Sequence, residues 1–449
     1  MEKSVLQKSR EAYTPKLPKA LRGFVDVKEG KPTQSVGDQD EIKKLFPKTY
    51  GLPLVEFVPG EKKTNEPINV GVILSGGQAP GGHNVISGIF DGIKRLNPEN
   101  RLYGFLMGPG GLVDHNYMEL TSDIIDNYRN TGGFDMIGSG RTKLEKVEQF
   151  EKGREIIEKL GIKALVIIGG DDSNTNACVL AEYYAAKNYG IQVIGCPKTI
   201  DGDLKNDQIE TSFGFDTATK TYSEVIGNIE RDANSAQKYW HFIKLMGRSA
   251  SHIALECALQ CHPNVTIISE EVEKNDTSLD EIVTYIAQAV ADRAADGNNF
   301  GTVLIPEGLI EFIPAIKRLI AELNDLLASE EGKKVEPKDH YNWIKSKLTG
   351  ENAAVYASLP EGAAKQLTME RDPHGNVQVS LIETEKLLSE MVANKLAEWK
   401  KEGKFNGKFA AQHHFFGYEG RCAAPSNYDA DYCYALGISA SELISNGQT

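Results

Sequence analysis

Short apolar runs alternate with helical patterns through the middle of the chain. The predicted strands in its first part are 68–74, 102–107, 164–168 and 192–197, and the predicted helices are 83–96, 146–160 and 174–188. The runs end in glycine-rich or acidic segments. This alternation predicts a parallel sheet with helices on both faces. Ligands of such sheets bind at the carboxyl ends of the strands, where those segments fall.

A second series of the same kind follows. Its predicted strands are 240–245, 264–268 and 301–305, and its predicted helices are 217–231, 251–259 and 279–295. Residues from about 314 to 400 are helical in pattern and rich in Lys/Glu pairs, which is typical of solvated helix faces. Residues 1–67 show no sustained period and contain scattered prolines, which favours an extension that flanks the body.

We therefore expect an α/β protein of two similar three-layer domains with parallel-rich sheets, an N-terminal extension and a helical insertion. The predicted division is 1–67 for the extension, 68–212 with 422–449 for the first domain, and 213–421 for the second, with the insertion at about 314–400. The length of 449 residues fits two domains.

The net charge of −13 argues against nucleic acid or an anionic membrane as the main partner. No apolar run approaches the roughly 18 residues of a membrane span. The polar, charged start is unlike a secretory signal, so we expect a cytoplasmic protein. An acidic chain that binds anions must concentrate its positive charge locally. Arg141, Lys198, Arg248 and Arg421, each near a glycine or a predicted strand end, are the candidates.

The first candidate site is Ser75-Gly-Gly-Gln-Ala-Pro-Gly-Gly82, between a strand and a helix. Glycines let backbone amides approach an anion, and a helix amino terminus favours negative charge. The segment matches neither the P-loop pattern nor the dinucleotide fingerprint, so both of those classes lose support. The alternative is a tight turn without a ligand.

The second candidate is Gly169-Gly-Asp-Asp-Ser173, which again joins a strand to a helix. Two adjacent carboxylates there could hold Mg²⁺ directly or through water. An acidic helix cap explains the same residues equally well.

The third candidate is Pro197-Lys-Thr-Ile-Asp-Gly-Asp203. One aspartate could accept a proton from an attacking hydroxyl, and Lys198 could neutralise charge on a transferred group. A polar loop with Asp-Gly turns is the alternative. The segments 138–141, 246–248, 306–308 and 418–421 each place a charge beside a glycine, and each alone is better explained as a turn.

Taken together and in this order, these segments resemble the phosphofructokinase family. The motifs are Ser-Gly-Gly-x-Ala-Pro-Gly, Gly-Gly-Asp-x-Ser, Thr-Ile-Asp-x-Asp, Met-Gly-Arg and Pro-Glu-Gly, spread from about residue 70 to the chain's end. Three features resemble the long, pyrophosphate-dependent branch. They are Asp172 where ATP-using members have Gly, Lys198 in Pro-Lys-Thr-Ile-Asp, and Tyr418 where shorter members have His.

The resemblance implies roles for individual residues. Asp201 would be the base, Asp171 would bind Mg²⁺, and Lys198 would stabilise the transferring phosphoryl group with Arg248. Asp172 would occupy the place of a nucleotide α-phosphate. Gly77, Arg141 and Lys198 would bind pyrophosphate. The residues implied to surround fructose 6-phosphate are Thr199, Ile200, Asp201, Lys238, Tyr239, Met246, Gly247, Arg248, Glu307, Tyr418, Glu419, Gly420 and Arg421.

The implied reaction is reversible, Mg²⁺-dependent transfer from pyrophosphate to the 1-hydroxyl of fructose 6-phosphate, which gives fructose 1,6-bisphosphate and phosphate in glycolysis. Lys238 and Tyr239 match positions that reach a neighbouring subunit's site, so the resemblance implies a homodimer. An ATP-dependent kinase of this fold and a non-catalytic regulatory subunit remain as alternatives. Two features depart from the family: Gln78 replaces an Asp of short members, and the chain stops where the family continues, with at least one strand and helix expected beyond it.

Overall fold

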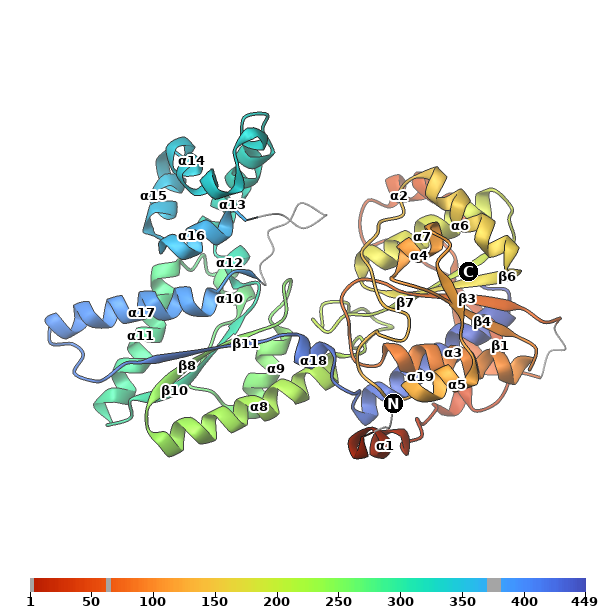
Figure 1. Cartoon of the computed structure of the whole chain (residues 1–449), viewed down its shortest axis with the longest axis horizontal. Helices are drawn as coiled ribbons and strands as arrows, with labels where there is room; N and C mark the ends of the chain where they lie inside the picture. Colours follow the sequence, from red (N-terminus) through yellow and green to blue (C-terminus); the bar gives the residue numbers. More distant parts are fainter. Residues whose placement is uncertain (1–3, 62–65, 370–380) are drawn as a thin grey trace. The chain divides into compact units, whose positions relative to one another are not determined.

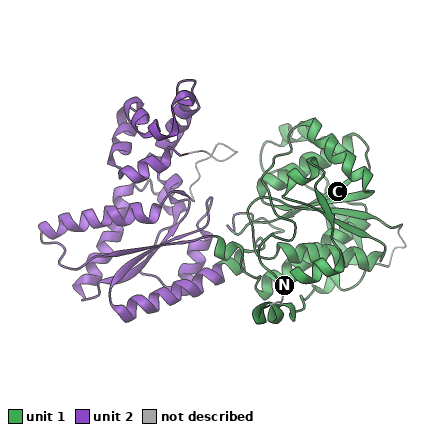
Figure 2. Cartoon of the chain, viewed as in Figure 1, with its two compact units in different colours: residues 1–200, 204–218, 418–449 green, residues 201–203, 219–417 purple. Residues whose placement is uncertain are grey.

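The computed structural model describes residues 4–61, 66–369 and 381–449, which form two compact units (Figure 2). Unit 1 comprises the described residues of 1–200 together with 204–218 and 418–449, and unit 2 comprises those of 201–203 and 219–417. The predicted domain limits were 212/213 and 421/422, whereas the contacts divide the chain at 218/219 and 417/418. The helix α8 (Phe215–Ala236) therefore begins in unit 1 and continues into unit 2.

Unit 1 contains a five-stranded sheet in the order β5-β4-β3-β6-β7. Its strands are β3 (Asn69–Leu74), β4 (Arg101–Phe105), β5 (Tyr117–Glu119), β6 (Ile162–Gly169) and β7 (Gln192–Pro197). All neighbouring pairs are parallel except β4 with β5. β3 and β6 are almost continuously apolar and buried, as strands covered on both faces must be.

Helices cover both faces of this sheet (Figure 1). One face carries α3 (Gly82–Leu96), α5 (Ser122–Tyr128) and α19 (Asn427–Ser445), and the other carries α4 (Pro109–Val113), α6 (Val147–Lys159) and α7 (Asp171–Ala186). Glycines bring α3 and α19 together: a side-chain carbon at Gly88 would lie 2.3 Å from the carbonyl oxygen of Tyr434, and one at Gly437 would lie 2.2 Å from that of Val85. The backbones of α19 and α3 therefore pack in direct contact.

The N-terminal extension belongs to unit 1. It forms α1 (Val5–Glu11), the 3-10 turn η1 (Lys19–Leu21), α2 (Gln39–Leu45), and the antiparallel strands β1 (Val25–Pro32) and β2 (Pro53–Pro59). Leu21 is buried against Ala435 and Ile438 of α19. The Glu182 carboxylate accepts the backbone N–H groups of Lys48 and Thr49. The extension thus packs on the body through both apolar and polar contacts.

Unit 2 has a four-stranded, fully parallel sheet in the order β11-β8-β10-β9. The strands are β8 (Tyr239–Leu245), β9 (Val265–Thr266), β10 (Phe300–Pro306) and β11 (Ala411–Phe416). α8 and α9 (His252–Cys261) lie on one face, and α11 (Leu279–Ala295) and α17 (Thr384–Lys401) on the other (Figure 1). The strand predicted at 264–268 is reduced to two residues, and β11 was not predicted.

The segment predicted as a helical insertion is helical where it is described. The elements around it are α10 (Ser269–Lys274), α12 (Leu309–Phe312), α13 (Pro314–Ala328), η2 (Gly332–Lys334), η3 (Pro337–Asp339), α14 (His340–Lys347), α15 (Gly350–Ser358) and α16 (Glu361–Leu367). Their apolar sides join one core with α11, α17, β8 and β10. Among the residues that the structure describes, none of the helices is both long and apolar enough to span a bilayer.

Candidate active site

Three loops of unit 1 meet at the carboxyl edge of its sheet. They follow β3, β6 and β7, which are neighbours in the order of strands. The N–H of Ser75 donates to the carbonyl of Ile168 at 2.8 Å, and the N–H of Lys198 donates to that of Gly169 at 2.8 Å. The three sequence segments predicted to carry chemistry in the first half are therefore brought together.

Hydrogen bonds fix the shape of the loop after β3. Gly76 adopts a left-handed backbone conformation, with φ of 81°, which favours glycine. Its N–H donates to the carbonyl of Gly140 at 3.0 Å, and its carbonyl accepts the Ser139 hydroxyl at 2.6 Å. The hydroxyls of Ser173 and Ser75 are 2.8 Å apart. The loop is held on both sides before any ligand is bound.

Cationic side chains surround this loop. A side-chain carbon at Gly77 would lie 3.4 Å from Nη1 of Arg421 and 3.8 Å from Nη2 of Arg141. One at Gly76 would lie 3.9 Å from Nζ of Lys198, a side chain that is only 5% exposed. Exposed backbone next to guanidinium and ammonium groups is the environment that binds phosphate oxygens. We name Gly76, Gly77, Arg141, Lys198 and Arg421 the cationic loop site.

Arg421, which the resemblance places among the sugar-binding residues, lies beside the loop after β3. It ends the short helix α18 (Tyr418–Arg421), which the structure groups with unit 1, and its Nη1 donates to the carbonyl of Gln78 at 3.1 Å. Glu419 and Tyr418 are exposed, and Gly420 is buried. The guanidinium therefore supplies positive charge to the loop after β3.

The acidic pair lies in the first turn of α7. This helix begins at Asp171 and not at the predicted residue 174, so Asp171 and Asp172 are its first two residues and both are exposed. The N-cap is Gly170, without a side-chain cap bond, and the two carboxylates lie in the first turn, where negative charge stabilises a helix. Asn174 donates instead to the carbonyls of Gly169 and Gly170, at 2.7 and 2.9 Å.

The donor set at this edge fits Mg²⁺. An exposed carboxylate such as that of Asp171 is a ligand that Mg²⁺ typically takes from a protein. Over the described ranges no three His, Cys, Asp or Glu side chains gather into a group that could hold a metal ion by themselves.

The segment after β7 crosses from one unit to the other. The backbone of Lys198 forms an isolated parallel β-bridge with Phe213. The Thr199 carbonyl accepts the Ser212 hydroxyl at 2.6 Å, and Ile200 is fully buried. Asp201, half-buried, is the first residue grouped with unit 2. Lys198 and Asp201 are thus joined by a backbone whose first half is firmly anchored.

In unit 2, two neighbouring strands bring their carboxyl ends together. β8 leads into Met246, Gly247 and Arg248, and β10 leads into Glu307. The N–H of Gly247 donates to Oε2 of Glu307 at 3.0 Å, and this carboxylate is 5% exposed. The N–H of Met246 donates to the carbonyl of Phe416 on β11 at 3.2 Å. The structure therefore brings together the predicted sugar-binding residues of these segments.

Lys238 and Tyr239 lie at the other end of β8. Tyr239 opens the strand, and Nζ of Lys238 lies 5.3 Å from the centre of its ring. A strand of this length spans about 20 Å, so these two residues are far from Arg248 of the same chain. This separation fits their predicted role toward a neighbouring subunit, which stays a prediction.

The side chain of Gln78, noted above as a departure from short family members, accepts the N–H of Phe134 at 3.1 Å. Sequence reasoning missed one buried polar group, Lys244 of β8. Lys244 is 1% exposed, donates to the carbonyl of Ile382 at 2.7 Å and lies 3.5 Å from Glu385. Burial lowers the pKa of Lys244, while the carboxylates of Glu385 and Glu307 act against that shift. The signal that could have revealed this buried group was the position of a lysine inside the apolar run of β8.

The chain is similar to known proteins along most of its length. The phosphofructokinase family model matches residues 69–444. A pyrophosphate–fructose 6-phosphate 1-phosphotransferase of Porphyromonas gingivalis is 66% identical, over 100% of this chain and 82% of its own length. The protein named subunit beta 1 of such an enzyme in Arabidopsis thaliana is 52% identical, over 99% of this chain and 78% of its own.

A solved structure supports the fold. The pyrophosphate-dependent phosphofructokinase of Nitrosospira multiformis superposes with a TM-score of 0.58 at 18% identity, covering 85% of this chain and 77% of its own. This confirms the predicted fold class. With the match over most of the sequence and the identity to full-length relatives, the chain belongs to the phosphofructokinase family.

Proposed function

We propose that this protein is a pyrophosphate-dependent phosphofructokinase. It transfers a phosphoryl group reversibly from pyrophosphate to the 1-hydroxyl of fructose 6-phosphate, which gives fructose 1,6-bisphosphate and phosphate. The observation that carries the proposal is the cationic loop site, where Arg141, Lys198 and Arg421 face the backbone of Gly76 and Gly77. Relatives at 66, 54 and 52% identity bear the name of this activity.

The choice of donor rests on Asp172. The carboxylate stands in the first turn of α7, directly beyond the loop that would hold the transferred phosphate. A nucleotide would have to place a further phosphate near this charge, and like charges at close range repel by about 1 kcal/mol in water and more where solvent is restricted. Pyrophosphate has no such group, so Asp172 selects against ATP.

The chemical steps fall to three residues. Asp201 accepts the proton of the sugar 1-hydroxyl while the oxygen of that hydroxyl attacks a phosphorus atom of pyrophosphate. Lys198 and Arg248 offset the negative charge that spreads over the transferring group. Mg²⁺, held by Asp171 together with the donor, would supply further charge neutralisation.

The residues that bind the sugar phosphate come from several segments of the chain. They are Thr199, Ile200, Met246, Gly247, Arg248, Glu307, Tyr418, Glu419, Gly420 and Arg421, with Lys238 and Tyr239 contributed by a second copy in a homodimer. Since Arg421 contacts the loop after β3, its charge also serves the donor. We also propose that the enzyme acts in the cytoplasm.

The test is a donor comparison with a matched pair of variants. Fructose 1,6-bisphosphate formation is measured with Mg²⁺ and either pyrophosphate or ATP, for wild type, Asp201→Asn and Asp203→Asn. Asp203 is the exposed acid of the same loop and serves as the control. We expect turnover with pyrophosphate only, and a loss of about 10²- to 10⁴-fold in kcat for Asp201→Asn alone.

Other outcomes would identify the error. Turnover with ATP would contradict the role of Asp172. Equal losses in both variants would remove Asp201 from the position of base. A folded protein that is inactive with either donor would favour a regulatory subunit.

A further inference from the structure

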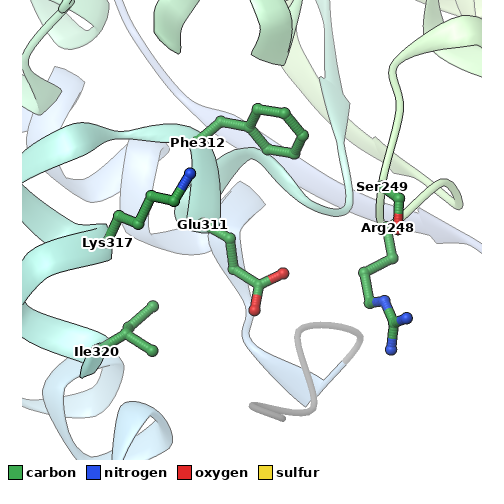
Figure 3. Close-up of a pocket in the computed structure, with 6 residues that line it drawn as sticks. All are labelled: Arg248, Ser249, Glu311, Phe312, Lys317 and Ile320. Carbon is green, nitrogen blue, oxygen red and sulfur yellow. The ribbon is translucent and has the colours of Figure 1, made fainter. Parts of the chain in front are cut away.

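A lysine is buried in the sheet of unit 2 close to Arg248 in the sequence. Lys244 of β8 is 1% exposed, and β8 leads directly into residues 246–248. Arg248 borders a cavity of about 320 Å³, a size that can hold a small-molecule ligand. The residues that line this cavity are Arg248, Ser249, Glu311, Phe312, Lys317 and Ile320 (Figure 3). A strand with a buried charge thus ends beside a space that can admit a ligand.

The Lys244 ammonium contacts groups from two other elements. Its Nζ donates to the carbonyl of Ile382, just before α17, at 2.7 Å. It lies 3.5 Å from Oε2 of Glu385, in the first turn of α17. It also lies 4.3 Å from the centre of the Phe415 ring on β11, which is within the range of a cation–π contact. The ammonium therefore connects β8 to α17 and to the edge strand.

The Glu307 carboxylate belongs to the same face of the sheet. Ile305 of β10 pairs with Lys244 in register, and residues two apart on a strand point to the same face. The N–H of Glu307 donates to the carbonyl of Leu245 at 2.8 Å, which holds Glu307 beside β8. Burial lowers the pKa of Lys244, and the carboxylates of Glu385 and Glu307 both oppose that shift. The charges of Lys244 and Glu307 therefore interact.

This interaction matters because both charges are buried. A charged group is far more costly to bury than a neutral one unless opposite charge and hydrogen bonds compensate it, and buried charges are weakly screened. The Glu307 carboxylate, 5% exposed, accepts the N–H of Gly247 at 3.0 Å, and an anion accepts this hydrogen bond more strongly than a neutral acid. Positive charge at Lys244 thus favours the form of Glu307 that holds the backbone of Gly247.

We propose that Lys244 is a positioning residue for the sugar-phosphate site, because its charge stabilises the Glu307 carboxylate that holds residues 246–248. Lys244 acts through Glu307 and not by contact with the substrate. The inference rests on the proposed function, since the ligand of Glu307 and Arg248 is taken to be fructose 6-phosphate.

A purely structural role is the alternative, in which Lys244 only attaches α17 to the sheet. The two roles can be separated because Lys244 interacts with two carboxylates. Glu385 belongs to the attachment of α17, whereas Glu307 belongs to the sugar-phosphate site. Removal of the Glu385 charge leaves the positive charge of Lys244 in place for Glu307, and removal of the Lys244 charge does not.

The test compares Lys244→Met, Glu385→Gln and the double variant with wild type. Methionine replaces the lysine by an uncharged side chain without branches, and glutamine keeps the shape of glutamate. Initial rates are measured with Mg²⁺ and with either fructose 6-phosphate or pyrophosphate varied. Calorimetry gives the Kd for fructose 6-phosphate without donor, and urea unfolding gives the stability.

We expect Lys244→Met to raise the KM and Kd for fructose 6-phosphate about tenfold, as expected when a hydrogen bond to a charged group is weakened, and to leave the KM for pyrophosphate unchanged. A merely destabilised enzyme would instead lose kcat through its smaller folded fraction and keep its KM. Glu385→Gln should unfold at a lower urea concentration with a wild-type KM. The double variant should regain stability, because no unpaired member of the ion pair is left, and should keep the raised KM.

Three results would overturn the inference while leaving the proposed function intact. The first is a folded Lys244→Met with an unchanged KM and Kd for fructose 6-phosphate. The second is an equal rise of this KM in Lys244→Met and Glu385→Gln. The third is a double variant with a wild-type KM, which also decides the question if Lys244→Met alone does not fold. Wild-type protein that neither binds nor turns over fructose 6-phosphate would overturn both proposals, and the wild-type measurement alone identifies that case.

Discussion

His83 couples the stability of unit 1 to pH. The side chain is fully buried in α3, directly after the cationic loop site. Its Nε2 accepts the N–H of Met136 at 3.2 Å, so that nitrogen carries no proton. Its Nδ1 lies 2.8 Å from Oγ1 of Thr131, which itself donates to the carbonyl of Tyr128. The ring is therefore neutral. Protonation of Nε2 would place its N–H opposite the N–H of Met136, and the hydrogen bond would be lost.

Burial lowers the pKa of His83 from 6.5 to about 4, and the Asp135 carboxylate at 3.7 Å opposes only part of that shift. Between these two values the unfolded chain binds a proton that the folded chain does not. The contribution of neutral His83 to the free energy of unfolding is thus fully present above the unfolded pKa and is lost as pH falls toward about 4. A difference of about 2.5 units corresponds to about 3 kcal/mol of unfolding free energy.

The assay is urea unfolding of wild type and His83→Gln, followed at intervals from about pH 7 to about pH 4.5. Glutamine keeps an acceptor for Met136 but does not titrate, so the variant should lose this part of the pH dependence. Circular dichroism reports both units. The tryptophans, Trp240, Trp343 and Trp399, all lie in unit 2, so their fluorescence is an internal control that the substitution should not change.

Equal pH dependence of unfolding in wild type and His83→Gln would refute this reasoning. So would an NMR titration of labelled histidine that finds His83 protonating near its ordinary pKa in the folded protein.

Three further perturbations follow from the structure. Gly308→Ala should raise the KM for fructose 6-phosphate about tenfold or more in steady-state assays, because the added carbon would displace Arg248. Gly227→Ala is the contrasting case: its added carbon would meet no atom within 4 Å, so it should stabilise α8 by about 1 kcal/mol. Asp172→Gly should give measurable turnover with ATP, and a variant still confined to pyrophosphate would contradict its assignment. Asp429→Ala should cost about 3 kcal/mol in chemical denaturation, since this buried carboxylate accepts the N–H groups of Gly214 and Thr217; an unchanged midpoint would count against that estimate.

The strands β3, β4, β6 and β7 could be predicted because most of their residues are apolar and buried, whereas β5 is only three residues long, is partly exposed and was not predicted. β11 escaped prediction since it is an edge strand with Gln412, His413 and His414 at partly exposed positions. β9 was overestimated because its pairing with β10 ends after two residues. α7 begins before residue 174 because Gly170 serves as the N-cap in place of a polar side chain. Local sequence pattern therefore predicts the strands that are apolar and buried along their length, but not the ends of elements that strand pairing or a backbone cap determines.

The loops of the candidate site were predictable from their glycines and charges, and the sheet order explains why they converge. The proximity of Arg421 to Gly77 could not be predicted, because it depends on a contact within unit 1 between segments more than 300 residues apart in the sequence. The closeness of Gly308 to Arg248 was not predictable either, because it arises from a contact between the loops after β10 and β8, which sequence spacing does not encode.

The cationic loop site has a kinetic consequence in so acidic a chain. A net charge of −13 repels pyrophosphate at long range, whereas the cations around Gly77 attract it only at close range. At 0.1 M salt the Debye length is about 10 Å, so added salt screens the repulsion more than the final contacts. Capture of the donor should then accelerate, or change little, as ionic strength rises from low values, opposite to the behaviour of a basic protein that attracts an anion from afar.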